Sequence, residues 1–231
     1  MQLSLREAAR ILGVDESTLH RWVRRGEIAA QRIHDQYRFD RVDLLEFASA
    51  RGIAVAPDML SDPEAHVQQL PRLSEAVRAG GVHHDVPGTD KASALRAVVD
   101  RLPVPAGIER GFLHQMLLAR EQLGSTGLGH GIAIPHPREP IVLRVTAPTV
   151  SVAYLTSPIE FDALDGRPVH TLFTVVSPSV RVHLHLLAVL AAALRDADVL
   201  AKVEGRAGEA ELVTAIARVE AELAARRVEV R

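Results

Sequence analysis

The sequence contains no cysteine, and this absence excludes disulfide bonds, thiolate metal ligands and thiol nucleophiles together. No stretch reaches the roughly 18 uncharged apolar residues that a membrane-spanning helix needs. The first ten residues, MQLSLREAAR, carry charges of both signs instead of the apolar core of a signal peptide. A formal net charge of −2 gives no overall basic field that would draw the molecule to nucleic acid. We therefore expect a cytoplasmic protein without membrane insertion, in which any DNA contact comes from a local patch.

The length and hydrophobicity are sufficient for one large domain or two smaller ones. The chain has 231 residues, 47% of them hydrophobic, and this composition argues against disorder. Residues 1–52 hold nine arginines, residues 53–71 hold three prolines and little periodicity, and residues 72–226 alternate helical and strand-like patterns. We predict a small N-terminal domain over 1–52, a linker over 53–71 and a larger domain over 72–226.

The first zone has clear signals for the start of two helices. Ser4 and Glu7 have the spacing of a capping box, which predicts a helix over 5–13. Asp15 is placed to cap a second helix over 16–25. Two short helices joined by the four residues LGVD predict a helix-turn-helix.

The rest of this zone predicts a hairpin and a third helix. The strand-like pieces AAQRI (29–33) and YRFD (37–40) would form a small wing around His34-Asp35-Gln36. Asp40 would then cap a helix over 41–51.

The second helix has the composition that reading of DNA requires. Leu19, Trp22 and Val23 share one face and are expected to point inward. Guanidinium groups neutralise phosphates and can bind guanine edges, and small polar groups reach other bases. A solvated helix in an ordinary three-helix bundle would have a similar pattern, so spacing alone leaves both interpretations open. The outward residues are Glu16, Ser17, Thr18, His20, Arg21, Arg24 and Arg25.

Residues 1–50 resemble the winged helix of the excisionase/MerR type. The resemblance runs through LSLREAARILGVDESTLHRWVRRGEI and YRFDRVDLLEF. It implies DNA binding, with the major groove facing Ser17, Thr18, Arg21 and Arg24, and with backbone or minor groove contacts from the wing residues Arg32 and Arg38. The wing departs from the family at its tip, where glycine is usual, and Asp35 near a phosphate would be unfavourable. Nine arginines against eight acidic residues give this zone a net charge of +1, so non-specific affinity should be modest and a homodimer or a specific site would be needed.

The larger zone has the pattern of a layered fold. We expect helices over 72–80, 90–101, 108–122, 182–196 and 208–226, strands over 149–156 and 169–177, and a strand and turn in VHHDVPG. In the third of these helices, Ile108, Phe112, Met116 and Leu117 are expected to form the inward face. Strands interleaved with helices predict an α/β or α+β fold.

Residues 125–140, STGLGHGIAIPHPREP, place a histidine between two prolines after a glycine-rich turn. The prolines would hold the His136 ring outward at small entropic cost, and a neutral imidazole is a competent nucleophile towards a phosphoryl group. Such a transfer needs donors and positive charge around the moving oxygens, which a histidine at a helix N-terminus, such as His183, and an arginine would supply. The glycines at 127, 129 and 131 would allow close approach of a partner's backbone.

The other histidines are expected to have no chemical role. His66 and His114 should lie on the surface, and His83, His84 and His170 lie in strand-like pieces. His183 and His185 are two residues apart on a helix, which points their rings in different directions. We therefore expect no metal and no cofactor.

Residues 72–226 resemble the enzyme IIA domain of the phosphotransferase system, in its fructose/mannitol class (type 2) and especially its nitrogen-regulatory branch. The resemblance runs through LAREQLGSTGLGHGIAIPHPR (118–138), IEFDALDGRPV (159–169) and HLHLLAVLAAALRD (183–196). It implies an α/β fold with a mixed sheet flanked by helices, and a phosphate donor that is HPr or its nitrogen-branch relative. By family position His136 is the phosphoacceptor, His183 the second active-site histidine and Arg120 the active-site arginine. The chain departs from the family at His130, where Asn or Asp is usual, and at Pro137-Arg138.

The combination predicts a transcriptional regulator. The chain would act as a phosphohistidine carrier and not as an enzyme with turnover, and phosphate on His136 would alter binding of DNA or a partner. Enzyme IIB of this class uses cysteine, which this chain lacks. Two alternatives stay open. The domain could carry phosphate to a separate IIB, or it could bind partners such as a kinase or a potassium transporter without needing phosphate.

Overall fold

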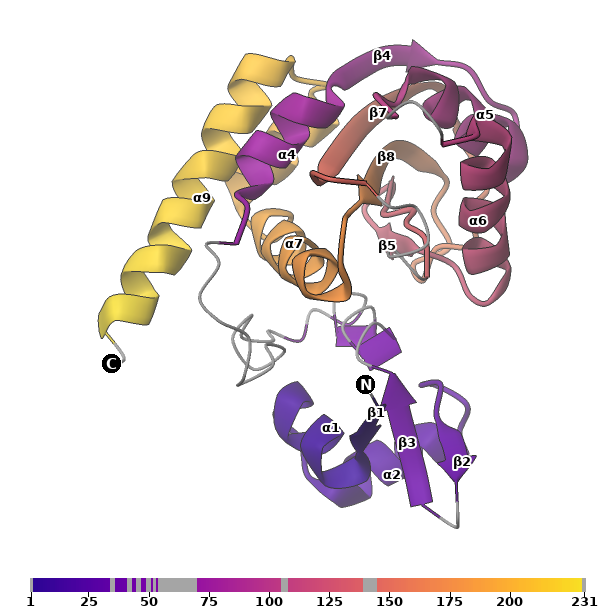
Figure 1. Cartoon of the computed structure of the whole chain (residues 1–231), viewed down its shortest axis with the longest axis vertical. Coiled ribbons are helices and arrows are strands. Elements are labelled where there is room, and N and C mark those ends of the chain that lie inside the picture. The colour runs from indigo at the N-terminus through magenta and orange to yellow at the C-terminus, as the bar shows by residue number, and fades with distance from the viewer. Residues whose placement is uncertain are drawn as a thin grey trace. The chain divides into compact units, whose positions relative to one another are not determined.

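The computed structural model describes residues 2–33, 36–40, 43–44, 47–48, 51, 53, 70–104, 108–138 and 145–229. The chain divides into two compact units, Met1–Gln68 and Gln69–Arg231. Figure 1 shows the elements of each unit. Among the helices of the described residues, none combines the length and the apolar character needed to cross a membrane.

The N-terminal unit has the two helices and the wing that the sequence predicts. Its elements are β1 (Gln2–Ser4), α1 (Leu5–Leu12), α2 (Glu16–Arg24), β2 (Gln31–Ile33) and β3 (Gln36–Asp40). The Ser4 hydroxyl and the Glu7 carboxylate form the expected capping box, and Gly13 ends α1 with a φ of 65°. The Asp15 carboxylate accepts the Thr18 amide at the start of α2. Local hydrogen bonds and the glycine at position 13 therefore account for the two ends of α1 and for the start of α2.

The sheet of this unit has three strands, in the order β1-β3-β2 with both pairs antiparallel. The β2–β3 hairpin is the predicted wing, whose tip residues His34 and Asp35 lie outside the described residues. Strand β1 was not predicted, because three residues show no periodicity and their pairing partner lies some 35 residues away. Most of the third helix predicted over 41–51 also lies outside the described residues, although 43–44 and 47–48 are helical.

The expected inward face of α2 is only partly buried. Leu19 is fully buried, whereas Trp22 and Val23 are half-buried. The Trp22 ring packs on Phe47, with centroids 5.1 Å apart, and Arg51 lies over it at 5.5 Å. All three residues are thus less exposed than Arg21 and Arg24 on the outward face, and Trp22 is covered by a ring and a guanidinium at the edge of the core.

The larger unit is built on one mixed five-stranded sheet. Its strands are β4 (Val82–Val86), β5 (Gly127–Gly129), β6 (Ile132–Ala133), β7 (Thr149–Ile159) and β8 (Val169–Val176), and their spatial order is β4-β7-β8-β6-β5. The pairs β4–β7 and β6–β8 are parallel, and β7–β8 and β5–β6 are antiparallel. This confirms the predicted α/β fold with a mixed sheet flanked by helices.

Helices cover both faces of this sheet (Figure 1). The core on one face joins α5 and α6 to apolar side chains of β7 and β8, including Leu155 and Leu172. On the other face, α4 packs against β7, and α7 packs against β8 and α9. The helices are α4 (Leu73–Gly80), α5 (Lys91–Arg101), α6 (Arg110–Gln122), α7 (Val180–Ala193), α8 (Ala197–Glu204) and α9 (Glu209–Glu229).

Two predictions about these helices were wrong or incomplete. Phe112 is 44% exposed, whereas Leu113 and Leu117 are buried. The buried face of α6 follows the one-turn spacing from Leu113 through Leu117 to Arg120, so Phe112 is turned away from it. Helix α8 was not predicted, although Asp196 caps it by accepting the amides of residues 198 and 199.

Candidate active site of the larger unit

The glycine-rich stretch forms a hairpin whose glycines make contacts inside the unit. A methyl group at Gly127 would lie 2.7 Å from the Ala163 side chain, and one at Gly131 would run into the His170 ring. Gly131 has a φ of 69°, and its carbonyl accepts both the His170 and the Thr171 amide. The expectation that these glycines make room for a partner's backbone was therefore wrong, because Gly127 and Gly131 admit the chain's own residues.

His130 shows why this hairpin tolerates a departure from the family pattern. Its φ is 52°, in the left-handed region that Asn, Asp and His enter more readily than other side chains. Its amide donates to the Asp165 carboxylate at 2.9 Å, and this bond holds the turn. The residue at this position therefore needs a left-handed backbone, and the three side-chain types share that property.

His136 follows the short strand β6 and lies in the interior. Pro135 extends the strand, since its carbonyl accepts the Val175 amide at 3.0 Å. The His136 side chain is only 2% exposed, so the expectation that the prolines hold the ring outward was wrong. The ring nitrogen Nδ1 lies 2.7 Å from the Ile134 carbonyl oxygen. A carbonyl oxygen can only accept, so Nδ1 carries the proton and the neutral ring has its lone pair on Nε2.

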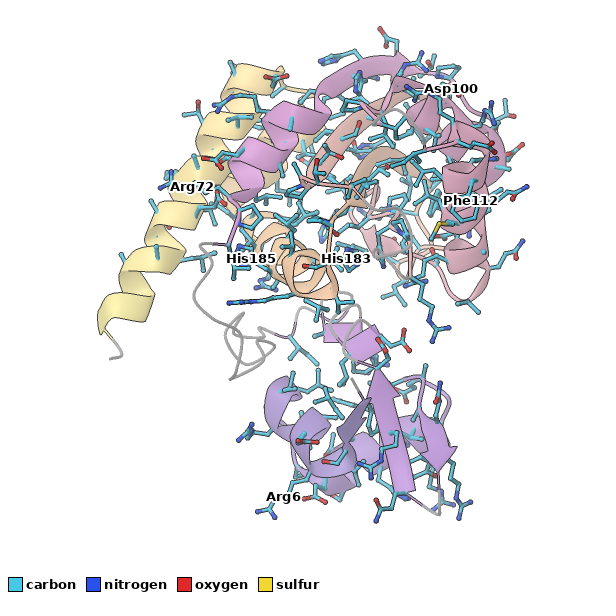
Figure 2. All side chains as sticks on the ribbon, in the orientation of Figure 1. Arg6, Arg72, Asp100, Phe112, His183 and His185 are labelled. Carbon is cyan, nitrogen blue, oxygen red and sulfur yellow. The ribbon has the colours of Figure 1, made fainter. Side chains whose placement is uncertain are left out.

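His183 lies in the first turns of α7 and faces His136. Ser179 caps this helix by accepting the Val182 amide. The His183 side chain is fully buried, and its ring centroid is 5.0 Å from that of His136, with the planes inclined by 51°. Figure 2 shows His183 and His185 on different sides of α7. The two histidines are far apart in the sequence, and the fold brings them together from the end of β6 and the start of α7.

Burial has a direct electrostatic consequence for His183. Desolvation, followed by the facing His136 ring and the Arg120 guanidinium, holds the pKa of His183 well below its usual value. His183 is therefore neutral at pH 7, with one ring N–H and one lone pair. Its Nδ1 lies 3.0 Å from the Ser177 hydroxyl oxygen.

Arg120 supplies a fixed positive charge beside these rings. It lies in the last turn of α6 and is only 7% exposed. One guanidinium nitrogen donates to the Gly124 carbonyl at 3.0 Å. The structure thus places all three residues of the expected phosphoacceptor site in one region, with the arginine charge acting on the second histidine.

A buried carboxylate next to Arg120 was missed in the sequence. Glu121 accepts the Thr126 hydroxyl at 2.6 Å and the Lys91 ammonium at 3.1 Å. Lys91 also pairs with Asp162 at 2.8 Å. These bonds join the end of α6 to the glycine-rich hairpin and to α5. The only sequence signal was that Lys91 is one of just two lysines in the chain.

The remaining described histidines have separate local contacts. His185 bonds to the Pro71 carbonyl, His114 to the Ala92 carbonyl and His83 to the Gly80 carbonyl. His114 is half-buried and not a surface residue as expected, because this bond draws its ring onto α5. Burial lowers the pKa of His170. Among the described residues, no three His, Asp or Glu side chains are grouped as metal ligands would be; His66 lies outside these residues.

The expected DNA-reading face of the N-terminal unit is exposed but internally bonded. The Asp15 carboxylate accepts the Ser17 hydroxyl at 2.5 Å and the Thr18 hydroxyl at 3.0 Å. These two hydrogen bonds, with the one from the Thr18 amide, lower the pKa of Asp15 to about 2. The Thr18 oxygen in turn accepts Arg21 at 3.3 Å. Both hydroxyls thus donate their hydrogens to Asp15, so towards a DNA base their oxygens can only accept hydrogen bonds.

The arginines expected to contact DNA differ in exposure. Arg24 and Arg32 are exposed, and Arg38 is half-buried and donates to Gln36 at 3.0 Å. The exposed His20 ring also meets Tyr37 of the wing edge-on, with centroids 5.4 Å apart, so α2 and β3 share one surface. A hollow on α2 is lined by Ser17, His20, Arg21, Arg24 and Arg25.

Comparison with known protein families finds a match for each unit. Residues 75–219 match the family described as "Phosphoenolpyruvate-dependent sugar phosphotransferase system, EIIA 2". Residues 3–52 match the family described as "Helix-turn-helix domain". Both matches agree with the resemblances seen in the sequence.

Individual relatives cover the larger unit. The "Nitrogen regulatory protein" of Pseudomonas aeruginosa is 39% identical over 132 residues, which are 55% of this chain and 83% of that protein. The "PTS system fructose-specific EIIA component" of Haloferax volcanii is 36% identical over 121 residues, covering 51% of this chain and 76% of that protein. The crystal structure of "Nitrogen Regulatory Protein IIA-Ntr" from Neisseria meningitidis has a TM-score of 0.55 at 27% identity, and the match covers 62% of this chain and 98% of that one.

Proposed function

Because the chain belongs to the EIIA 2 family of the phosphotransferase system and carries a helix-turn-helix domain ahead of it, we propose that it is a phosphate-responsive regulator. Its larger unit accepts a phosphoryl group on Nε2 of His136. One observation carries this proposal. The buried rings of His136 and His183 have centroids 5.0 Å apart, and the Nδ1–H group of His136 is hydrogen-bonded to the Ile134 carbonyl.

The donor is phosphohistidine on an HPr-type carrier protein, as the family implies. In the transfer, the N–P bond of the donor breaks and its electron pair stays on the donor's ring nitrogen. The lone pair on Nε2 of His136 forms the new N–P bond, and the proton on Nδ1 stays in place. No proton has to leave His136, because the Ile134 carbonyl has already selected the reactive tautomer.

The neighbouring groups stabilise the transferred charge. The buried Arg120 guanidinium supplies a permanent positive charge in a site from which water is largely excluded, where such charges act strongly. His183 is neutral and can donate one N–H to a phosphoryl oxygen without adding a second charge. Arg120 is thus assigned to charge stabilisation and His183 to hydrogen bonding.

The N-terminal unit binds DNA through α2 and the wing. The exposed face of α2 offers Arg21 and Arg24 for phosphates or guanine edges, and the oxygens of Ser17 and Thr18 as acceptors. On the wing, Arg32 and Arg38 contact the DNA backbone. The domain boundaries are those of the sequence analysis: 1–52, a linker over 53–71, and 72–226. A homodimer in the cytoplasm would present two such units to a two-fold site.

Phosphorylation is tested first with the full chain. It is incubated with phosphoenolpyruvate, enzyme I and HPr, beside the His136→Ala variant, and intact mass is measured at neutral pH. We expect wild type to gain one phosphoryl group and the variant to gain none. Equal gain in both proteins, or none in wild type with either HPr or its nitrogen-branch relative, contradicts the proposal.

Regulation is tested by DNA binding in the two states. We expect phosphorylated and unphosphorylated wild type to differ in affinity for a selected duplex. Equal affinities would remove the coupling. Onward transfer of the phosphate to a separate enzyme IIB would instead favour a carrier role. Binding of a kinase or transporter that is unchanged by His136→Ala would favour a partner-binding role.

A further inference from the structure

The two facing histidines are held through the same ring atom but by chemically different groups. Nδ1 of His136 lies 2.7 Å from a backbone carbonyl oxygen, and Nδ1 of His183 lies 3.0 Å from the Ser177 hydroxyl. A carbonyl oxygen only accepts, whereas a hydroxyl can donate or accept. The carbonyl therefore fixes one tautomer of His136, while the hydroxyl permits both tautomers of His183.

Ser177 is placed to act on His183. It follows β8, is fully buried, and its bond to His183 crosses from the end of that strand to α7. At the other side of the same ring, Nε2 of His183 is buried and has no hydrogen-bond partner among the described residues. A buried polar atom without a partner costs free energy unless a ligand completes it. This atom belongs to the ring that faces His136.

We propose that Ser177 is a positioning residue that selects the tautomer of His183 when His136 carries phosphate. The Ser177 hydroxyl donates a hydrogen bond to Nδ1 of His183. Nε2 of His183 then carries the ring proton and donates it to a phosphoryl oxygen on His136. This inference rests on the proposed phosphoacceptor function and assigns one further residue to it.

The electrostatics of the site favour this arrangement over protonation. A second positive charge on His183 is opposed by desolvation, by the His136 ring and by Arg120. The neutral ring can still donate a hydrogen bond from one nitrogen while its other nitrogen accepts a hydrogen bond. The Ser177 hydroxyl lies within hydrogen-bond distance of that nitrogen. Without the hydroxyl, either tautomer of His183 leaves a buried ring nitrogen unsatisfied.

The first test uses NMR of the full chain labelled with nitrogen-15 in histidine. The protein is phosphorylated either by the HPr system or by phosphoramidate, a small chemical donor that needs no carrier protein. We expect His183 of phosphorylated wild type to carry its proton on Nε2, with Nδ1 showing the shift of a hydrogen-bonded lone pair. A proton on Nδ1 of His183 in this state would overturn the proposal.

The second test compares the lifetime of the phosphohistidine among variants. We expect Ser177→Ala to shorten it by about tenfold, the effect of losing roughly one hydrogen bond to a charged group. The matched control is Ser151→Ala, which removes a buried hydroxyl that has no hydrogen-bond partner among the described residues and should leave the lifetime unchanged. In a His183→Ala background, Ser177→Ala should have no further effect.

The outcomes separate the two proposals. If only phosphoramidate phosphorylates His136, the HPr-dependent function fails and the tautomer of His183 still decides the role of Ser177. If neither donor phosphorylates His136, both proposals fail. A wild-type lifetime in Ser177→Ala overturns the role of Ser177 alone. If this variant does not fold, the tautomer of His183 in phosphorylated wild type decides whether Ser177 has the proposed role.

Discussion

The imidazole rings of His136 and His183 lie next to each other in the interior of the larger unit, with centroids 5.0 Å apart and planes inclined by 51°. The two residues are 2% and 0% exposed and come from different elements, the extension of β6 and the start of α7. Burial keeps the second ring neutral, and the carbonyl bond orients the first. The site therefore combines one nucleophile and one neutral donor beside a fixed arginine charge.

The lowered pKa of His183 predicts that the protein loses stability in acid. Below the ordinary histidine pKa of about 6.5, the unfolded chain binds a proton that the folded chain excludes. Stability from this group is therefore complete above pH 6.5 and falls as the pH drops below it, on the order of 1 kcal/mol per pH unit. His183→Gln should reduce the slope of unfolding free energy against pH between 6.5 and 5, measured by urea denaturation. A variant with the wild-type slope would show that His183 is not the cause.

The pair of Lys91 and Glu121 predicts an unequal result for the chain's two lysines. Lys91→Met leaves the buried Glu121 carboxylate without its cation, which should lower the unfolding free energy by about 2 kcal/mol. Lys202→Met breaks only an i,i+4 pair with Asp198 on a helix surface and should cost less than about 0.5 kcal/mol. Far-ultraviolet circular dichroism in urea measures both. Equal losses of unfolding free energy in the two variants would mean that the buried pair stabilises the fold no more than the surface pair does.

Two glycines of the larger unit should respond in opposite directions to alanine. Gly131→Ala combines a positive φ with a methyl group driven into the His170 ring, so we expect it to destabilise by roughly 2 kcal/mol or more. Gly111 lies in α6 with open space where a methyl group would go, and alanine there should stabilise by up to about 1 kcal/mol. Thermal unfolding of the two variants provides the measurement. A neutral Gly131→Ala would contradict the packing described for the hairpin.

The salt dependence of DNA binding tests the role assigned to α2. Arg24→Ala removes an exposed guanidinium, and the slope of log affinity against log salt should fall by about 1 if Arg24 neutralises one phosphate. The control is Arg96→Ala on α5, which breaks an exposed pair with Asp100 and should leave the slope unchanged. Fluorescence anisotropy with a mixed-sequence duplex at several salt concentrations measures both. An unchanged slope in Arg24→Ala would place the DNA contact elsewhere.

The features that the sequence predicted correctly are those determined by local chemistry. Ser4 with Glu7, and Asp15 with Thr18, set helix starts through hydrogen bonds three residues apart. Strands β7 and β8 are long enough to show their apolar pattern. The mixed sheet was predicted only from the family resemblance, because β4 pairs with β7 across about 70 residues of sequence.

The same distinction applies to the site. His136, His183 and Arg120 followed from motifs that match a family, whereas the burial of His136 depends on β6 running beside β8. Ser177 gave no sequence signal, because its role arises only when the end of β8 meets α7. The missed face of α6 has a similar origin, since Phe112 and Leu113 are neighbours in sequence and only packing selects between them.

The most direct test of the account is to locate the phosphoryl group on the protein. Full-length protein labelled with nitrogen-15 in histidine is phosphorylated by phosphoenolpyruvate, enzyme I and HPr, and phosphorus–nitrogen coupling is measured by NMR. Because Nδ1 of His136 donates to the Ile134 carbonyl, we predict coupling to Nε2 of His136. Coupling to Nδ1 of His136, or to another histidine, would contradict the account.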